Sequence, residues 1–234
     1  MDHAKPGWTV KERKLKRVFD LVFSAICMIV LLPFFLLIAA LLKLEGLRNP
    51  AYRGPVFWKE TRVSRGREFG ILKFRTVRAD IAKRLEAAGG SVSITSYTGA
   101  RENLTPVGCL LAKCYFDEWP QIINVLKGEM SLVGPRPHMV SHYENDLKEG
   151  IISAKYIKAG IFGLMQASKG NVRMKKTLLR MATKYVSKDK HAVFVDRLYY
   201  RHYLTASALE VMMLDIYIIY KCALVCIKAE GVKP

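Results

Sequence analysis

Hydrophobic and polar positions follow two different patterns along the chain. Near the N-terminus, a basic stretch from Lys11 to Arg17 leads into an uncharged apolar run from Leu21 to Leu42. Beyond that run, shorter apolar segments are broken by charged and turn-forming residues, with periods typical of strands and amphipathic helices. The pattern therefore predicts one membrane segment followed by a mixed helical and strand-containing region.

The membrane segment carries Pro33 near its middle. Proline removes a backbone donor and disrupts the preceding helical turn. Lys43, Arg48 and Arg53 follow the run, so both ends are basic, whereas a spanning helix leaves most nearby cations on one side. We therefore expect a re-entrant helix hairpin broken at Pro33, because each arm would reach only roughly 18 Å into a hydrocarbon core of about 30 Å. The alternative is a single spanning helix that tolerates the proline.

Two extended runs follow, from Val56 to Val63 and from Glu68 to Thr76. The turn between them contains Gly66, which can adopt positive φ, so the pattern predicts a small β-hairpin. Lys73 and Arg75 would lie on one face of the second strand. Two cations on one edge could hold a diphosphate, although a solvated strand face explains the pattern about equally well.

Helical patterns run from Asp80 to Ala88, from Thr105 to Cys114 and from Leu204 to Ile227. Gly89 to Arg101 is polar and rich in turn residues, which indicates a surface connection. Charged residues such as Asp215 interrupt the last apolar run, which favours a helix lying on the membrane or against the core. We thus expect an α+β fold that is mostly helical, with amphipathic interfacial helices.

Asp117 and Glu118 open a short apolar segment that leads to Gly128. Asp117 can act as an N-cap and Pro120 fits a first helical turn, so a helix of roughly ten residues should begin near Asp117. Backbone donors and the positive end of the helix dipole would favour phosphate oxygens there. On spacing alone, a cap and an ordinary first-turn acid explain the pair more simply.

Arg136 lies between Pro135 and Pro137. Both prolines have fixed φ and push the residue before them toward an extended conformation. A guanidinium presented in this way loses little freedom when it binds a phosphate or a base. An ordinary proline-rich turn with an exposed arginine is the alternative, and it is the more common meaning of such a motif taken alone.

The net charge of +18 over 234 residues indicates a polyanionic partner, such as nucleic acid, anionic lipid or nucleotide phosphate. The long apolar run and the lack of an aromatic and basic binding motif disfavour nucleic acid. The five cysteines have no zinc-like pairing with histidines and are expected to be reduced core or lipid-facing residues. His138 and His142 have the spacing of metal ligands without a third ligand, so we interpret them as structural or surface residues.

The order of these motifs resembles the bacterial sugar transferases, also called monotopic phosphoglycosyl transferases. The resemblance covers roughly residues 14 to 220. It rests on the basic start, the proline-broken run and the motifs Gly54-Pro55-Val56-Phe57, Lys73-Phe74-Arg75-Thr76, Asp117-Glu118 with Gln121, and LKGEMSLVGPRP.

The resemblance implies transfer of a sugar 1-phosphate from a UDP-sugar donor to undecaprenyl phosphate, with release of UMP. This would be the first membrane step of a bacterial exopolysaccharide, capsule, O-antigen or glycoprotein pathway. Asp117 would be the nucleophile that forms a phosphosugar-aspartyl intermediate and would hold Mg²⁺, with Glu118 assisting. Substrate contacts would come from Lys73, Arg75, Arg136 and Gln166.

The resemblance further implies a monotopic protein on the cytoplasmic face of the bacterial inner membrane, with membrane lipid as a partner and a homodimer left open. Residues 1–48 would form the basic N-terminus and re-entrant helix, and residues 49–234 a catalytic domain that acts with them as one unit. Ala112 stands where the family usually has arginine, and residues 158–166 lack the family's proline and tryptophan. We interpret these departures as those of a divergent or unusually specific member. The changed residues 158–166 are also the best support for the alternative, a catalytically altered scaffold that is anchored in the membrane and binds anionic lipid or partner proteins.

Overall fold

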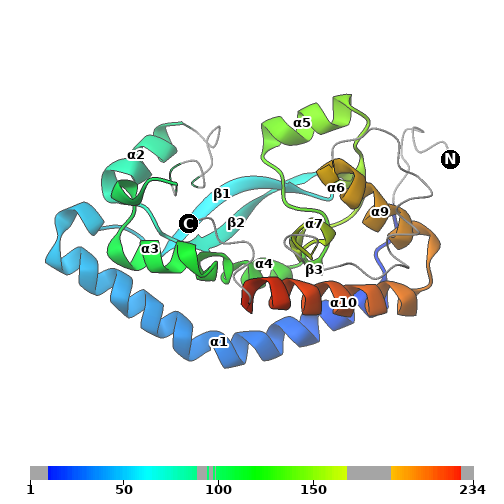
Figure 1. Ribbon diagram of the computed structural model, residues 1–234, viewed down its shortest axis with the longest axis horizontal. Helices are drawn as coiled ribbons and strands as arrows, with labels where there is room; N and C mark the ends of the chain where they lie inside the picture. The colour runs from blue at the N-terminus through cyan, green and yellow to red at the C-terminus, as the bar shows by residue number, and fades with distance from the viewer. Residues whose placement is uncertain (1–9, 89–93, 95–96, 98, 168–190, 228–234) are drawn as a thin grey trace.

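A computed structural model describes residues 10–88, 94, 97, 99–167 and 191–227, and the side chains of 191–195 and 226–227 lie outside the description. Most of the expected connection from Gly89 to Arg101 also lies outside it. Two long helices, α1 (Lys14–Arg48) and α10 (Ala208–Ile227), pack together along the base of the molecule. The strands and shorter helices lie above this base (Figure 1).

The structure is mostly helical with two small sheets. The strands are β1 (Phe57–Ser64), β2 (Arg67–Phe74), β3 (Ser131–Val133) and β4 (Gly160–Phe162). The shorter helices are α2 (Ala79–Ala87), α3 (Pro106–Lys113), α4 (Gln121–Lys127), α5 (Val140–Lys148), α6 (Ser153–Tyr156), α7 (Leu164–Ala167) and α9 (His191–Thr205). The 3₁₀ turns bounded within the described residues are η1 (Pro50–Tyr52), η3 (Arg101–Asn103) and η4 (Phe116–Glu118).

Helix α1 continues through Pro33 without ending there. Figure 1 shows it bent and not folded back on itself, as expected for a helix that tolerates an internal proline. The predicted break at Pro33 is therefore absent from the helix, and a re-entrant placement stays a prediction. Among the described residues, α1 is the one helix long and apolar enough to cross a membrane.

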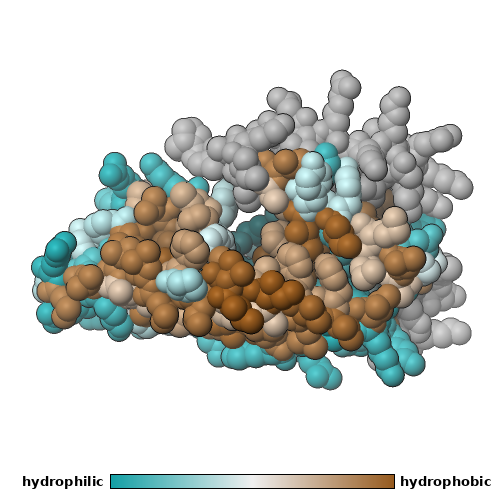
Figure 2. Space-filling view, turned by 90° about the horizontal axis from the view of Figure 1, so that it is seen from below, coloured by the Kyte–Doolittle hydropathy of each residue, from teal (hydrophilic) through white to brown (hydrophobic). Residues whose placement is uncertain are grey.

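The outer faces of α1 and α10 are apolar. Figure 2 shows a brown band along the underside of the molecule. Exposed members include Ile26, Val30 and Phe34 of α1 and Ile216 and Tyr220 of α10. A contiguous exposed apolar surface of this kind marks a membrane or partner interface, so the helices indicate association with a membrane.

The predicted β-hairpin is confirmed. Strands β1 and β2 pair antiparallel from Phe57 opposite Phe74 to Ser64 opposite Arg67. Arg65 and Gly66 form the turn, and both have positive φ, which matches the twist of the flanking strands. A second sheet pairs β3 with β4 in parallel.

The expected helices from Asp80 and from Thr105 correspond to α2 and α3, and Thr105 caps α3 by accepting a hydrogen bond from the Gly108 amide. The expected helix from Leu204 is corrected, because α9 ends at Thr205 and α10 begins only at Ala208. The break is a capping box, in which the Ser207 amide donates to the Glu210 carboxylate and the Glu210 amide to the Ser207 hydroxyl.

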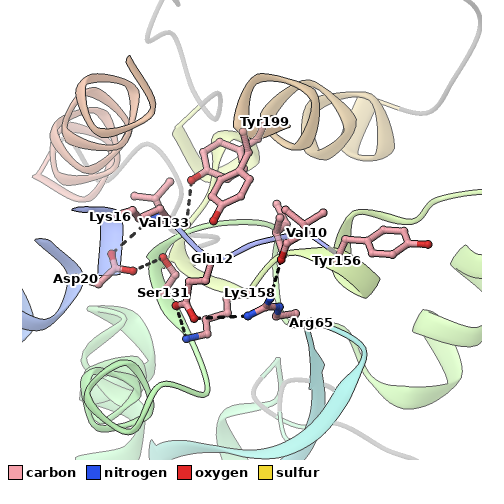
Figure 3. A pocket seen from close by; sticks show the side chains of 12 residues that line it. Val10, Glu12, Lys16, Asp20, Arg65, Ser131, Val133, Tyr156, Lys158 and Tyr199 are labelled. Carbon is pink, nitrogen blue, oxygen red and sulfur yellow. Dashed lines mark hydrogen bonds and ion pairs between the residues drawn. The ribbon is translucent and has the colours of Figure 1, made fainter. Parts of the chain in front are cut away.

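A buried polar network joins α1 to the rest of the fold, and Figure 3 shows the part of it around Lys16, Asp20 and Ser131. Lys16 Nζ lies 2.5 Å from Asp215 Oδ2 of α10 and 3.7 Å from Asp20 Oδ1. Asp20 accepts a hydrogen bond from the Ser131 hydroxyl at the start of β3. Tyr199 of α9 donates to Asp215. Since all five side chains are buried, each charge depends on its partners for compensation.

Replacing Lys16 with methionine should destabilise the protein by about 3 kcal/mol, because it leaves the Asp215 and Asp20 carboxylates buried without their cation. Thermal unfolding in detergent micelles measures the loss. Lys14→Met, at an exposed position on the same helix, is the control and should leave the melting temperature nearly unchanged. Equal melting temperatures for the two variants would contradict the role given to this ion pair.

Candidate active site

Asp117 and Glu118 lie in η4 and not in a longer helix. Tyr115, just before this turn, has a left-handed conformation that redirects the chain as it leaves α3. Helix α4 begins at Gln121 with Pro120 at its N-cap, so the prediction that Asp117 caps this helix is wrong. Gly128 ends α4 with positive φ, as its position in the sequence predicts.

Glu118 lies between two cations. Lys73, near the end of β2, places its Nζ 3.3 Å from Glu118 Oε1. Arg136, from the segment between two prolines, places Nη2 3.8 Å from the same oxygen. Three of the predicted site residues therefore converge from β2, η4 and the segment after β3.

The two neighbouring carboxyl groups are in different electrostatic states. Burial and the Glu118 charge raise the pKa of Asp117 to about 7, while Lys73 opposes the rise. Burial acts to raise the pKa of Glu118 as well, but Lys73 and Arg136 outweigh it and lower this pKa below its usual value. Adjacent acids with separated pKa values are typical of catalytic sites.

A polar cavity of about 420 Å³ opens beside these residues. Its walls include Lys73, Glu118, Gln121, Arg136, His142 and Gln166. Asp117 retains 8% of its surface exposed and does not line this cavity. A ligand in the cavity would thus meet Glu118 and the two cations before it reaches Asp117.

Arg75, a predicted substrate contact, lies away from the polar cavity. Strand β2 ends at Phe74, and the fully buried guanidinium of Arg75 donates to the carbonyl oxygens of Tyr52, Pro55 and Val77. The prediction that Lys73 and Arg75 share one phosphate-binding face is therefore wrong. Arg75 instead holds the segment that contains Tyr52 and Pro55 against the end of β2 through these hydrogen bonds.

Gln166 of α7 lines the polar cavity and was among the predicted residues. Its amide nitrogen lies 3.5 Å from the Ile161 carbonyl oxygen, and its Oε1 is buried with no hydrogen-bond partner in the described part of the chain. Buried polar atoms in native proteins are nearly always paired. An unpaired oxygen at a cavity wall therefore favours a ligand that can donate to it.

His138 and His142 also line the polar cavity, where the sequence predicted only structural or surface residues. His138 Nδ1 pairs with the Asp146 carboxylate of α5. The spacing of the two histidines and their position just after Arg136 were the signals that could have placed them here. The pairing of His138 with Val63 of β1 and the packing of α5 against β1 bring them to the cavity.

The described residues contain no cluster of three or more His, Cys, Asp or Glu side chains able to hold a metal. Mg²⁺, however, is usually bound by one or two carboxylates and completed by substrate phosphates and water. Asp117 and Glu118 supply that donor set, so the site fits a magnesium ion that arrives with a phosphate ligand.

A second cavity, of about 450 Å³, shares Glu118, Arg136, Ile161 and Gln166 with the first. Its other walls are mainly apolar. The site residues thus form a boundary between a polar space and an apolar one.

The sequence model for bacterial sugar transferases matches residues 11–228. The chain belongs to the bacterial sugar transferase family. Asp117, Glu118 and Arg136 all lie within the matched range.

This bacterial sugar transferase is similar to several curated proteins. It is 34% identical over 157 residues to the UDP-glucose:undecaprenyl-phosphate glucose-1-phosphate transferase of Escherichia coli (strain K12), an alignment of 66% of this chain and 31% of the relative. It is 37% identical over 158 residues to the protein of the same name from Caulobacter vibrioides, covering 64% of this chain and 52% of the relative. It is 33% identical over 191 residues to the exopolysaccharide production protein ExoY of Rhizobium meliloti, covering 77% and 80%. The chain thus spans about a third of the E. coli relative and about half of the Caulobacter one.

Replacing Arg75 with methionine should lower stability by about 3 kcal/mol, because the carbonyl groups of Tyr52, Pro55 and Val77 lose a charged donor. Chemical denaturation followed by intrinsic tryptophan fluorescence measures the change. Arg67→Met, at an exposed position at the start of β2, is the matched control. A stable Arg75→Met protein that has lost only donor affinity would restore the original prediction of a substrate contact.

Proposed function

We propose that this bacterial sugar transferase transfers a sugar 1-phosphate from a UDP-sugar to undecaprenyl phosphate and releases UMP. The observation that supports it most is the convergence of Lys73 and Arg136 on Glu118 beside Asp117, where the polar and apolar cavities meet. The printed names of the E. coli and Caulobacter relatives, which include both a UDP-sugar and undecaprenyl phosphate, agree with this proposal.

In the first step, a carboxylate oxygen of Asp117 attacks the β-phosphorus of the donor. A bond forms between that oxygen and the phosphorus, and the bond from the phosphorus to the bridging oxygen breaks, so UMP leaves with the electron pair. A carboxylate forms an acyl phosphate without losing a proton in the step, and the resulting phosphosugar-aspartyl intermediate divides the transfer in two. The ionised form of Asp117 is therefore the reactive one.

Lys73 and Arg136 would bind the donor phosphates and stabilise the charge that develops on them. In the structure both cations face Glu118, which therefore holds them in place before a phosphate enters. The lowered pKa of Glu118 keeps it ionised, so we assign it to positioning these cations and assisting at the metal, and not to removing a proton. Gln166, in the wall of the polar cavity, would donate or accept a hydrogen bond.

In the second step, a phosphate oxygen of undecaprenyl phosphate attacks the phosphorus of the intermediate. The bond from phosphorus to Asp117 breaks, which restores the carboxylate and yields the sugar linked through a diphosphate to the lipid. Magnesium would be the cofactor, and Asp117 would hold it. When bound, it would offset the repulsion between the carboxylate and the diphosphate.

We place the protein on the cytoplasmic face of a bacterial inner membrane, with α1 inserted as a monotopic anchor and residues 49–234 acting beside it. An active site held at this depth can meet a lipid phosphate without lifting the lipid from the bilayer. The step would begin a bacterial glycan pathway. The departures at residues 158–166 do not remove the site, because this segment forms β4 and part of α7 and supplies Ile161 and Gln166 to both cavities.

The Asp117→Asn variant should release UMP at least a thousandfold more slowly than the wild type, because the amide cannot act as the nucleophile. UMP release from a panel of UDP-sugars with undecaprenyl phosphate measures it. Asp80→Asn, at an exposed position, is the control and should retain activity. Mass spectrometry of wild type with donor alone should find a sugar-phosphate adduct on Asp117. The proposal is overturned if no UDP-sugar yields UMP or if Asp117→Asn keeps full activity.

The pH dependence of donor kcat/KM should reveal the raised pKa of Asp117. Because a carboxyl group is protonated below its pKa, the rate should fall as the pH drops through about 7. Lys73 lowers the pKa of Asp117, so Lys73→Met should move this limb to higher pH and reduce the rate. The assignment would be contradicted if the acidic limb of the pH profile lay near the ordinary pKa of aspartate. It would also be contradicted if the limb did not move in the Lys73→Met variant.

A further inference from the structure

The apolar cavity lies between elements that come from distant parts of the chain. Helix α1 contributes Phe23 and Leu31, α4 contributes Ile122, and α10 contributes Ile219 and Cys222. Phe116 and Trp119, whose rings pack against each other, form the wall next to η4. Its volume of about 450 Å³ falls within the range of about 300–1,000 Å³ common for ligand pockets.

The two long helices that enclose this cavity carry exposed apolar side chains on their outer faces, including Ile26 of α1 and Ile216 of α10. Figures 1 and 2 show both helices at the base and the apolar band along it. The helices that would contact lipid therefore also form walls of the cavity. An apolar chain could enter it from the membrane without crossing water.

The polar end of the cavity is the wall shared with the polar cavity. Arg136 supplies a cation there, Gln166 an amide, and Glu118 an acid whose charge Lys73 and Arg136 balance. A ligand that fits has an apolar chain for the interior and an anionic head for Arg136. Phospholipid has such a head as well, but its two acyl chains and bulky diester suit this single cavity and shared wall less well than one apolar chain ending in a phosphate.

We propose that the apolar cavity holds the first isoprene units of the polyprenyl phosphate acceptor, with the acceptor phosphate at the shared wall beside Arg136. The proposal rests on the proposed function and assigns to it a binding site for the lipid chain. Glu118, Arg136 and Gln166 then face the donor on one side and the acceptor on the other. The same groups serve both half-reactions, and α10 becomes part of the acceptor site.

Filling the cavity tests this assignment. Ile219→Trp should raise the KM for polyprenyl phosphate about tenfold, comparable to losing the burial of roughly two methylene groups. The exchange of labelled UMP into the UDP-sugar, measured without acceptor, should stay within about twofold of wild type. Ile216→Trp makes the same change three residues away on the exposed face of α10 and should leave both values unchanged.

The outcomes separate the inference from the proposed function. An equal rise in acceptor KM for both variants, or loss of UMP exchange in Ile219→Trp, would overturn the acceptor site. Absence of UMP release by the wild-type protein from every donor would instead overturn the proposed function. A second measurement, which needs no catalytic turnover, tests whether the acceptor occupies the cavity.

Native thiols provide that measurement. Cys27 and Cys114 line the apolar cavity, whereas Cys109 is a free cysteine outside its walls. In phosphatidylglycerol vesicles, added undecaprenyl phosphate should slow labelling of Cys27 and Cys114 by N-ethylmaleimide severalfold and leave Cys109 unchanged, as read by peptide mass spectrometry. Equal labelling with and without undecaprenyl phosphate would show that bulk lipid or nothing occupies the cavity, and would overturn the inference.

Discussion

Lys16 of α1 and Asp215 of α10 form a buried ion pair at the base of the molecule, and the geometry of the site depends on it. The same cluster includes Asp20, which accepts from Ser131 at the start of β3, and Tyr199, which donates to Asp215. Burying a charge is costly unless it is paired, so these partners cannot separate without a large loss of stability. The membrane helix is thereby held against the strand that leads to Arg136.

The need to pair buried charges also shapes the active site. Glu118 is held by Lys73 and Arg136, which keeps it ionised and keeps both cations at the cavity wall. Asp117, next to it, is buried beside that negative charge, and its pKa rises to about 7. The two neighbouring carboxyl groups thus acquire different roles, because Glu118 has cationic partners whereas Asp117 is mainly desolvated. The resulting site is poised for an anionic substrate that can take over the two cations.

Several elements could be predicted from local sequence because local chemistry decides them. The turn at Gly66, the cap at Thr105 and the helix end at Gly128 each depend on a backbone conformation or hydrogen bond within a few residues. The prediction at Asp117 was wrong because residues 116–118 form the separate 3₁₀ turn η4, and α4 begins only at Gln121 with Pro120 at its N-cap. The prediction for Arg75 was wrong because its guanidinium donates to the carbonyl groups of Tyr52 and Pro55, which are distant in sequence, and of Val77.

The sequence by itself determined the long apolar helix, the hairpin, and the residues of the acid pair and the proline-flanked arginine, because these depend on composition and short-range spacing. Only the tertiary structure decided that Lys73 and Arg136 meet at Glu118, that His138 and His142 reach the cavity, and that α10 closes an apolar space against α1. Those relations join segments far apart along the chain. They follow from packing and from the pairing of buried charges, which no local pattern of residues records.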